Sequence, residues 1–343
     1  MERAIGLARN KHTHPNPTVG AVLVLDGEIV GEGFHEGPGR HHAEVVALLA
    51  AGENASGATA YVSLEPCAHH GRTPPCADAL IEAGVATVVV GAGDPDTRVA
   101  GRGIERLRAA GIEVVTGVME AEALALDPGY FHHRRTGLPR VTLKLALTLD
   151  GSVAAADGTS QWITGEEARA DGHRLRAESD AVMVGAGTLL ADDPLLTARL
   201  DGFAGHQPRP VVVAGSRPLP AEARIWERDP IVIAPGPLDV PGQVIEAPNG
   251  QGGVDLTSGL GALAGAGYLD VLAEGGSGLA GSLLRDGLIN RGVIYYGGVL
   301  AGGAGLGAFD GSFASLAAAH PVTITSVDRL GADIRVVFMP KGS

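Results

Sequence analysis

The sequence predicts an α/β protein with two domains, and three observations support this. The chain has 343 residues, more than a single domain usually contains. Short apolar runs alternate with segments of helical spacing in both halves. This alternation breaks once, around residues 127–140, where Pro128-Gly129 and Gly137-Leu138-Pro139 predict a connector. We therefore expect one domain at residues 1–137 and a second at residues 138–343.

The first domain is expected to open with a helix start at Met1 and then a β-hairpin. Residues 19–25 are an apolar run, Asp26-Gly27 is a hairpin turn signal, and residues 28–33 continue as the partner strand. The pattern then predicts strands at 59–64, 87–90 and 112–116, and helices at 42–51, 75–83 and 103–110. Such alternation favours a sheet with helices on both faces.

The second domain continues the alternation without copying the first. We expect strands at 141–147, 181–184, 211–214, 231–234, 271–273 and 293–296, and helices at 166–175 and 277–286. The dinucleotide fingerprint G-x-G-x-x-G is absent, because Gly185-Ala186-Gly187 is only a fragment of it. Glu274-Gly275-Gly276-Ser277-Gly278 follows a strand and opens a helix, which suits either a phosphate site or a plain turn.

The most specific motif joins His42-Ala43-Glu44 to Pro66-Cys67 and Cys76. One imidazole and two thiolates supply three ligands for a catalytic zinc, which keeps a fourth position for water. Zinc deaminases combine H-x-E with P-C-x-x-C and use the Glu as general acid and base. Here eight residues separate the cysteines, and the longer loop adds His69 and Arg72 near the expected pocket.

The motif has three other interpretations. His42 could cap a helix beside ordinary buried thiols, or Cys67 and Cys76 could form a disulfide, but the disulfide explains neither His42 nor Glu44. A structural zinc module would need a fourth protein ligand, which only His41, His69 or His70 could supply. Because both cysteines of the chain fall in this one segment, a zinc hydrolytic site is favoured.

Composition limits the partners. A net charge of −13 argues against a nucleic-acid-binding protein, which needs a basic surface. No apolar run approaches the length of a membrane span, and no N-terminal signal pattern is visible. Two cysteines suit a reducing compartment. We therefore expect a cytoplasmic protein that acts on a small molecule, with no nucleic-acid or membrane partner.

Motifs along nearly the whole chain carry a family resemblance. They are His14-Pro15-Asn16-Pro17-Thr18-Val19-Gly20, His42-Ala43-Glu44, Glu65-Pro66-Cys67, Thr73-Pro74-Pro75-Cys76, Asp94-Pro95, Val99-Ala100-Gly101-Arg102-Gly103, Lys144-Leu145-Ala146-Leu147-Thr148-Leu149-Asp150-Gly151, Ser160-Gln161-Trp162-Ile163-Thr164 and Leu190-Ala191-Asp192-Asp193-Pro194. With these motifs, the first half resembles the riboflavin-pathway pyrimidine deaminases, and the second is similar to the pyrimidine reductase joined to them in the bifunctional enzymes. This resemblance implies a three-layer cytidine-deaminase-like domain followed by a dihydrofolate-reductase-like domain.

The resemblance also implies an activity and site residues. The implied substrate is a diaminopyrimidine ribosyl phosphate. Its deamination would use a zinc ion held by His42, Cys67 and Cys76, with Glu44 as the group that transfers the proton. NADPH would then reduce the ribosyl group of the product to ribityl. Implied contacts to the deaminase substrate are Asn16, His69, Arg72 and Asp94. Implied contacts to the reductase substrate are Lys144, Arg176, Asp192, Leu196, Arg199 and Glu274. Implied cofactor contacts are Trp162, Thr164, Gly185, Thr188, Asp192, Ser216, Gly275 and Gly276.

Several alternatives stay open at this stage. The chain could have a single activity with one degenerate domain, or be a zinc deaminase that edits RNA. Asp192 and Glu274 are both candidates for acid or base in the reduction. Ser216 and Arg217, just past a predicted strand, could read the 2′-phosphate of NADPH or form a surface turn. A homo-oligomer is expected for a dihydrofolate-reductase-like domain.

Overall fold

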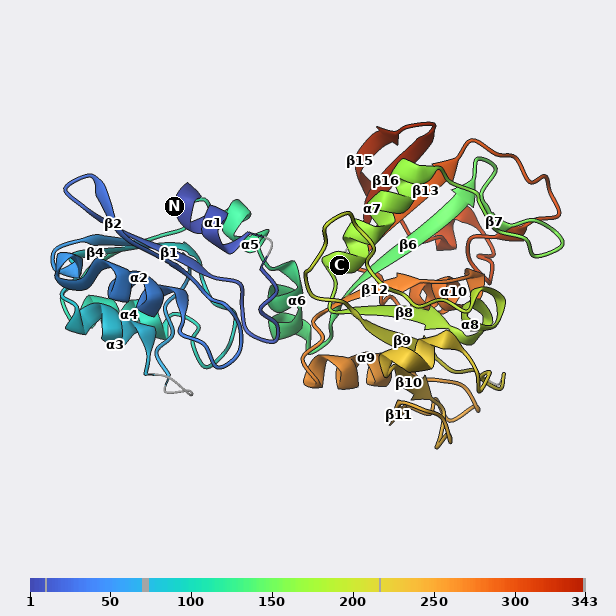
Figure 1. The fold of residues 1–343 in the computed structure, drawn as a ribbon, viewed down its shortest axis with the longest axis horizontal. Coiled ribbons are helices and arrows are strands. Elements are labelled where there is room, and N and C mark those ends of the chain that lie inside the picture. The colour runs from blue at the N-terminus through green and yellow to red at the C-terminus, as the bar shows by residue number, and fades with distance from the viewer. Residues whose placement is uncertain (10, 70–73, 216, 342–343) are drawn as a thin grey trace. The chain divides into compact units, whose positions relative to one another are not determined.

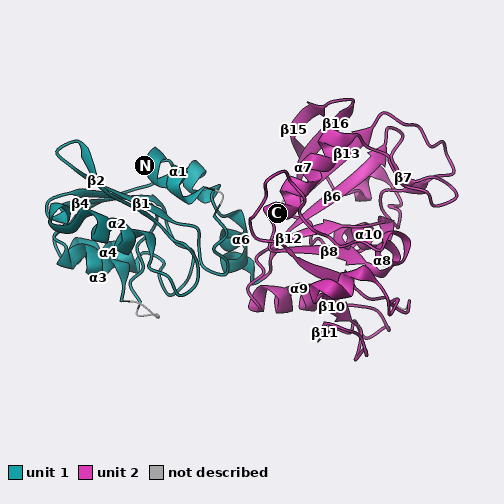
Figure 2. Ribbon diagram, viewed as in Figure 1, with its two compact units in different colours: residues 1–137 teal, residues 138–343 magenta. Residues whose placement is uncertain are grey.

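A computed structural model describes residues 1–9, 11–69, 74–215 and 217–341. The chain divides into two compact units, Met1–Gly137 and Leu138–Ser343 (Figure 2). In the described ranges, none of the helices has the length and apolar character that a membrane span requires. Each unit is an α/β structure with its own sheet, as the alternating pattern predicts.

Unit 1 is built on a five-stranded sheet in the order β2-β1-β3-β4-β5. Strand β1 pairs antiparallel with β2 and β3, whereas β3, β4 and β5 run parallel. The carboxyl ends of β3 and β4 therefore lie at the same edge of the sheet. The strands are β1 (Gly20–Leu25), β2 (Glu28–Phe34), β3 (Thr59–Leu64), β4 (Thr87–Ala92) and β5 (Glu113–Thr116).

Helices cover both faces of this sheet. Figure 1 shows α2, α3 and α4 on one face and α1 with α5 on the other. Helix α2 approaches β2 closely because Gly31 and Gly33 have no side chain: a Cβ there would lie only 2.2 and 2.4 Å from the carbonyl oxygens of Ala47 and Ala43. The helices are α1 (Glu2–Ala8), α2 (Ala43–Ala51), α3 (Cys76–Glu82), α4 (Arg102–Ala109), α5 (Glu120–Leu124) and α6 (Pro128–Thr136).

The expectation of an irregular connector at residues 127–140 is wrong for most of that stretch. Helix α6 occupies it. The Asp127 carboxylate caps the helix by accepting from the backbone N–H of Tyr130, and Pro128 fits the first turn, where no N–H is needed. Gly137 ends the helix with a φ of 77°. These helix start and stop signals involve neighbouring residues. They favour a helix over the turn that Pro128-Gly129 alone would predict.

Unit 2 contains a nine-stranded sheet in the order β11-β10-β9-β8-β12-β6-β13-β16-β15. The strands from β11 to β13 are parallel, and β16 and β15 add an antiparallel edge. A small second sheet pairs β7 with β14. The strands are β6 (Arg140–Thr148), β7 (Ser152–Ala154), β8 (Ala181–Gly185), β9 (Arg209–Val213), β10 (Ile231–Ala234), β11 (Gln243–Glu246), β12 (Asp270–Glu274), β13 (Arg291–Gly297), β14 (Leu306–Gly307), β15 (Val322–Leu330) and β16 (Asp333–Pro340).

Two apolar cores lie on the two faces of the large sheet, because alternate side chains of buried strands point to opposite faces. One core joins the sheet to α9 and α10 through residues such as Leu260 and Leu283. The other joins it to α7 and α8 through Leu175 and Leu189. Together they hold the carboxyl ends of the parallel strands rigidly, and this is where ligands bind in open α/β sheets. The helices are α7 (Glu166–Ala177), α8 (Ala186–Asp192), α9 (Leu256–Gly265) and α10 (Ser277–Arg285).

Candidate functional site

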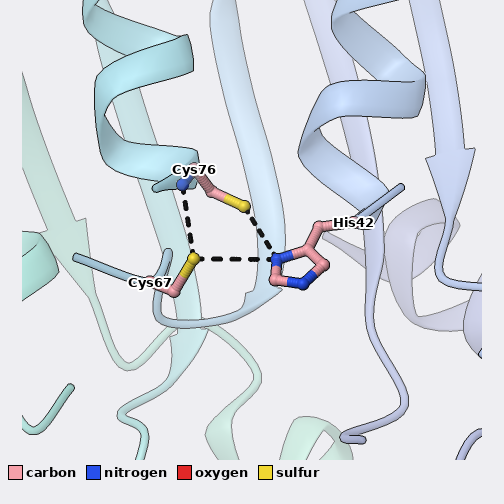
Figure 3. A group of neighbouring side chains, drawn as sticks. All are labelled: His42, Cys67 and Cys76. Carbon is pink, nitrogen blue, oxygen red and sulfur yellow. Dashed lines mark hydrogen bonds between the residues drawn. The ribbon is translucent and has the colours of Figure 1, made fainter. Parts of the chain in front are cut away.

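Three side chains with metal-binding atoms converge at one edge of the unit 1 sheet. His42 precedes α2, Cys67 follows β3, and Cys76 is the first residue of α3. His42 Nδ1 lies 3.1 Å from Cys76 Sγ and 3.6 Å from Cys67 Sγ, and all three donor atoms lie within 4.8 Å of one another (Figure 3). Tetrahedral zinc holds such donors roughly 3.5–3.8 Å apart, so this donor set fits the metal.

The local electrostatics favour a thiolate at this cluster. A hydrogen bond from Cys76 and the nearby His42 ring lower the pKa of Cys67 to about 4, against the effect of burial. The backbone N–H of Cys76, at the start of α3, also donates to Cys67 Sγ over 3.3 Å. Both cysteines are free, which excludes the disulfide reading in this structure.

Glu44 lies in the first turn of α2, beside the cluster. It is only 4% exposed, and its carboxyl group interacts with the Cys76 thiol. Burial, reinforced by the negative charge of Cys67, raises the pKa of Glu44 to about 7. A carboxyl group with that pKa can both take up and release a proton near neutral pH.

Glu65 holds the loop that carries Cys67. Its buried carboxylate accepts hydrogen bonds from the backbone N–H groups of Asp94, Gly101 and Gly103 at 3.0–3.3 Å. A Cβ at Gly103 would lie 1.9 Å from the Pro66 carbonyl oxygen, so only glycine allows α4 to approach this closely. The loop after β4 is thereby fixed against the Pro66-Cys67 turn.

His35, which the sequence pattern does not single out, connects Asn16 to the cluster. The His35 ring lies edge-on to the His42 ring with centroids 5.3 Å apart, and its Nε2 lies 3.0 Å from Asn16 Nδ2. The backbone carbonyl of His41 accepts from His35 Nδ1 over 3.0 Å. A lone histidine at a strand end gives no sequence signal, because its partners come from the tertiary fold.

Unit 2 contains a cavity of about 1390 Å³ at the carboxyl ends of β6, β8 and β12. Eleven of the residues expected around the reductase site line it: Lys144, Trp162, Thr164, Arg176, Gly185, Thr188, Asp192, Leu196, Glu274, Gly275 and Gly276.

A charged cluster forms one wall of this cavity. Strand register places Lys144 of β6 beside Glu274 of β12. Glu274 accepts two hydrogen bonds from Arg176, at 2.5 and 2.9 Å, and Lys144 Nζ lies 3.5 Å away. Burial alone would raise the pKa of Glu274, but these two cations outweigh it and lower the pKa to about 2. The carboxylate is therefore ionised at neutral pH.

The turn that follows Glu274 can accept the diphosphate of a dinucleotide. The N-terminus of α10 faces the cavity through Gly275 and Gly276, and Gly276 N–H donates to Thr188 Oγ1 over 3.2 Å. A Cβ at Gly275 would come within 3.3 Å of Leu279, so this turn is tightly packed. Backbone N–H groups at a helix N-terminus attract phosphate. These residues thus fit NADPH without a Rossmann fingerprint.

Known protein families match both units of the chain. Residues 1–92 match the cytidine and deoxycytidylate deaminase zinc-binding region, and residues 139–336 match the RibD C-terminal domain. A riboflavin biosynthesis protein RibD from Mycobacterium tuberculosis is 46% identical over 97% of this chain and 96% of its own length. The chain belongs to the RibD family. A second relative, the riboflavin biosynthesis protein RibD of Aquifex aeolicus, is 40% identical over 98% of this chain and 97% of its own length.

Solved RibD structures share the fold. The chain is similar to Acinetobacter baumannii RibD with a TM-score of 0.91 and 40% identity, over 99% of this chain and 97% of that one. A Thermotoga maritima protein described as a diaminohydroxyphosphoribosylaminopyrimidine deaminase/5-amino-6-(5-phosphoribosylamino)uracil reductase gives 0.87 and 34%, with the same coverage. The expected family and fold class are confirmed. As a RibD, the chain is a bifunctional deaminase and reductase of riboflavin biosynthesis, and this reading is favoured over a single-activity enzyme or an RNA editor.

The other residues expected in the RibD sites have the following surroundings, or lie outside the described residues. Asp94 is buried, and its carboxylate accepts from Tyr130 Oη and from the backbone N–H of Asp96 at 3.0 and 2.9 Å. The guanidinium of Arg199 donates to Thr197 Oγ1, and Arg199 is not among the residues that line the cavity. Arg72 and Ser216 lie outside the described residues. His69 is half-buried, and its Nδ1 has no hydrogen-bond partner among the described residues.

Proposed function

We propose that residues 1–137 hydrolytically deaminate 2,5-diamino-6-(5-phosphoribosylamino)pyrimidin-4(3H)-one, and that residues 138–343 then reduce its ribosyl group to ribityl with NADPH. The observation that carries this proposal is the convergence of His42, Cys67 and Cys76 beside buried Glu44. The substrate class is that in the name of the Thermotoga maritima protein.

In the deaminase site, His42, Cys67 and Cys76 would hold zinc. When bound, the metal supplies the Lewis acidity that activates water. Glu44 takes one proton from the attacking water and passes it to the ring nitrogen. It then takes the remaining proton of the new hydroxyl group and passes it to the amino group, which leaves as ammonia; a pKa of about 7 suits both the uptake and the release of these protons. Asn16, oriented by His35, and His69, whose Nδ1 has no hydrogen-bond partner in the described part of the chain, are the proposed pyrimidine and phosphate contacts. Arg72 and Asp94 are proposed contacts by resemblance alone.

In the reductase site, NADPH supplies the hydride. Gly185, Thr188, Gly275 and Gly276 would cradle its diphosphate, with Trp162, Thr164 and Asp192 as further contacts. The substrate would lie against Lys144, Arg176, Leu196 and Glu274, with Arg199 nearby. Glu274 cannot donate a proton at neutral pH, because Lys144 and Arg176 keep it ionised. Its role is to orient those two cations.

Assays of the two half-reactions test this proposal. The full chain should release ammonia from the diaminopyrimidine phosphate and oxidise NADPH when given the deaminated intermediate. Asp192→Asn should slow NADPH oxidation and leave ammonia release near the parent value, because the described residues that line the cavity with Asp192 all belong to unit 2. An equal loss of both activities would contradict two separate sites.

We expect Arg217 to distinguish NADPH from NADH. Arg217 lines the cavity, and its Nη1 lies 3.4 Å from the position that a Cβ on Gly187 would take. Arg217→Ala should raise the KM for NADPH by roughly ten- to hundredfold, the loss expected for one charge-assisted contact to the 2′-phosphate. The KM for NADH should hardly change. Equal effects on both cofactors would mean that Arg217 only shapes its loop.

We also propose a cytoplasmic homo-oligomer that assembles through the β15–β16 edge. Strand β15 is the last strand of the large sheet, and Ile324 and Val327 on it are 60% and 62% exposed. Unpaired edges with apolar side chains favour pairing with another chain. Light scattering should give a multiple of the chain mass, and Ile324→Lys combined with Val327→Lys should reduce it to one chain. A monomeric parent protein would contradict the proposal.

A further inference from the structure

The segment 160–165 at the cavity rim has a closely packed backbone at Ile163 and Gly165 and one exposed aromatic side chain. The Asp333 carboxylate accepts from the Gly165 N–H over 2.6 Å. Gly297 allows close packing of Ile163, because a Cβ at Gly297 would lie 1.8 Å from the Ile163 carbonyl oxygen. Trp162 immediately precedes these two packed positions, and it is 70% exposed. Backbone packing therefore does not by itself determine where the indole lies.

Arg169, on the first turns of α7, contacts both the indole and the segment that carries it. Its guanidinium carbon lies 4.7 Å from the centroid of the Trp162 ring. Its Nη1 donates to the Thr164 backbone carbonyl over 2.6 Å. A planar guanidinium can stack on an aromatic face and donate in its own plane at the same time, which an ammonium group cannot do. Arg169 thus links the side chain of Trp162 to the fixed backbone at Thr164.

The three residues belong to the same binding surface. Trp162, Thr164 and Arg169 all line the cavity, together with the Gly275-Gly276 turn that fits a diphosphate. A cation against one face of an exposed indole limits its rotation and leaves its other face for a flat ligand ring. The Trp162 ring is therefore held in its binding position before the ligand arrives. Holding a side chain in this way reduces the conformational entropy that is lost on binding.

We propose that Arg169 is a positioning residue of the reductase: it holds the Trp162 indole against the cavity wall so that the ring contacts NADPH. The proposal rests on the proposed function of Trp162 as a cofactor contact. Arg169 acts through Trp162, so its loss should weaken NADPH binding more than it slows the chemical step.

Fluorescence of the full-length protein tests the proposal. The chain has two tryptophans, so a Trp226→Phe background leaves Trp162 as the only indole. In this background, Arg169→Leu should increase the acrylamide quenching of Trp162 and raise the Kd for NADPH roughly tenfold. The KM for NADPH should rise in parallel, with kcat changed by less than about twofold. Arg169→Lys should lie between Arg169→Leu and the parent, because it keeps the charge but not the planar fork.

Controls separate the possible failures. Ammonia release from unit 1 and the thermal unfolding of unit 2 report whether each variant folds; if Arg169→Leu does not fold, Arg169→Lys decides. Parent-like NADPH affinity and parent-like Trp162 quenching in the folded Arg169 variant would overturn the proposal. Trp162→Leu tests the underlying assignment: unchanged NADPH affinity in that variant would remove Trp162 as a cofactor contact. Weaker binding in Trp162→Leu but not in the Arg169 variants would overturn only the role of Arg169.

Discussion

Glu44→Gln should keep its zinc and release ammonia about 10² to 10⁴ times more slowly than the parent protein. The amide has nearly the same shape as the carboxyl group but cannot take up a proton, and Glu44 is not one of the three clustered donors. Metal content and the rate of ammonia release, measured on the same samples, check this result.

Control variants separate the loss of proton transfer from the loss of zinc. Glu53→Gln, an exposed glutamate beyond α2, should leave both quantities unchanged. Cys67→Ser and His42→Ala should instead lose zinc together with activity, because two protein ligands hold the metal poorly. NADPH oxidation on the deaminated intermediate should persist in all four variants. Near-parent deamination by Glu44→Gln would remove Glu44 from the mechanism.

Glu274→Gln should abolish reduction and destabilise unit 2 by about 3–5 kcal/mol, the usual cost of leaving a buried charge without its partner. Arg176 and Lys144 would both lose the carboxylate that orients them. The measurements are NADPH oxidation and denaturant unfolding. Asp229→Asn is the matched control, since Asp229 pairs with Arg209 at the surface and its side chain is 74% exposed. Exposed pairs contribute only about 0–1 kcal/mol.

The same substitution should change the pH dependence of unfolding. The pKa of Glu274 is lowered to about 2 in the folded state, so its ionisation stabilises the fold above the ordinary glutamate pKa. That stabilisation is lost as the pH falls from about 4.5 towards 2. Glu274→Gln should therefore show a weaker loss of stability over this interval than the parent. An identical pH profile would mean that the Glu274–Arg176 pair does not form in solution.

Local sequence patterns were sufficient for some features and insufficient for others. The apolar run at residues 19–25 and the Asp26-Gly27 turn predicted the β1–β2 hairpin, because strand and turn signals involve adjacent residues. Helix α6 was missed although its signals, Asp127, Pro128 and Gly137, are equally local. The β15–β16 edge was not predicted, although β16 contains the apolar run Val336-Val337-Phe338-Met339. Its partner β15 is exposed along most of its length and lacks such a run.

The sequence alone determined the zinc-binding residue types, the family and the two-domain α/β class, because spacing and residue chemistry are properties of the chain itself. Three contacts were evident only in the tertiary structure. His35 lies within hydrogen-bond distance of Asn16. Glu274 pairs with both Lys144 and Arg176, and Arg169 stacks on Trp162. Arg176 and Glu274 lie 98 residues apart, and their contact depends on the order in which parallel strands join the sheet. That order follows from burying the apolar faces of all strands at once, a collective free energy that no short pattern of residues contains.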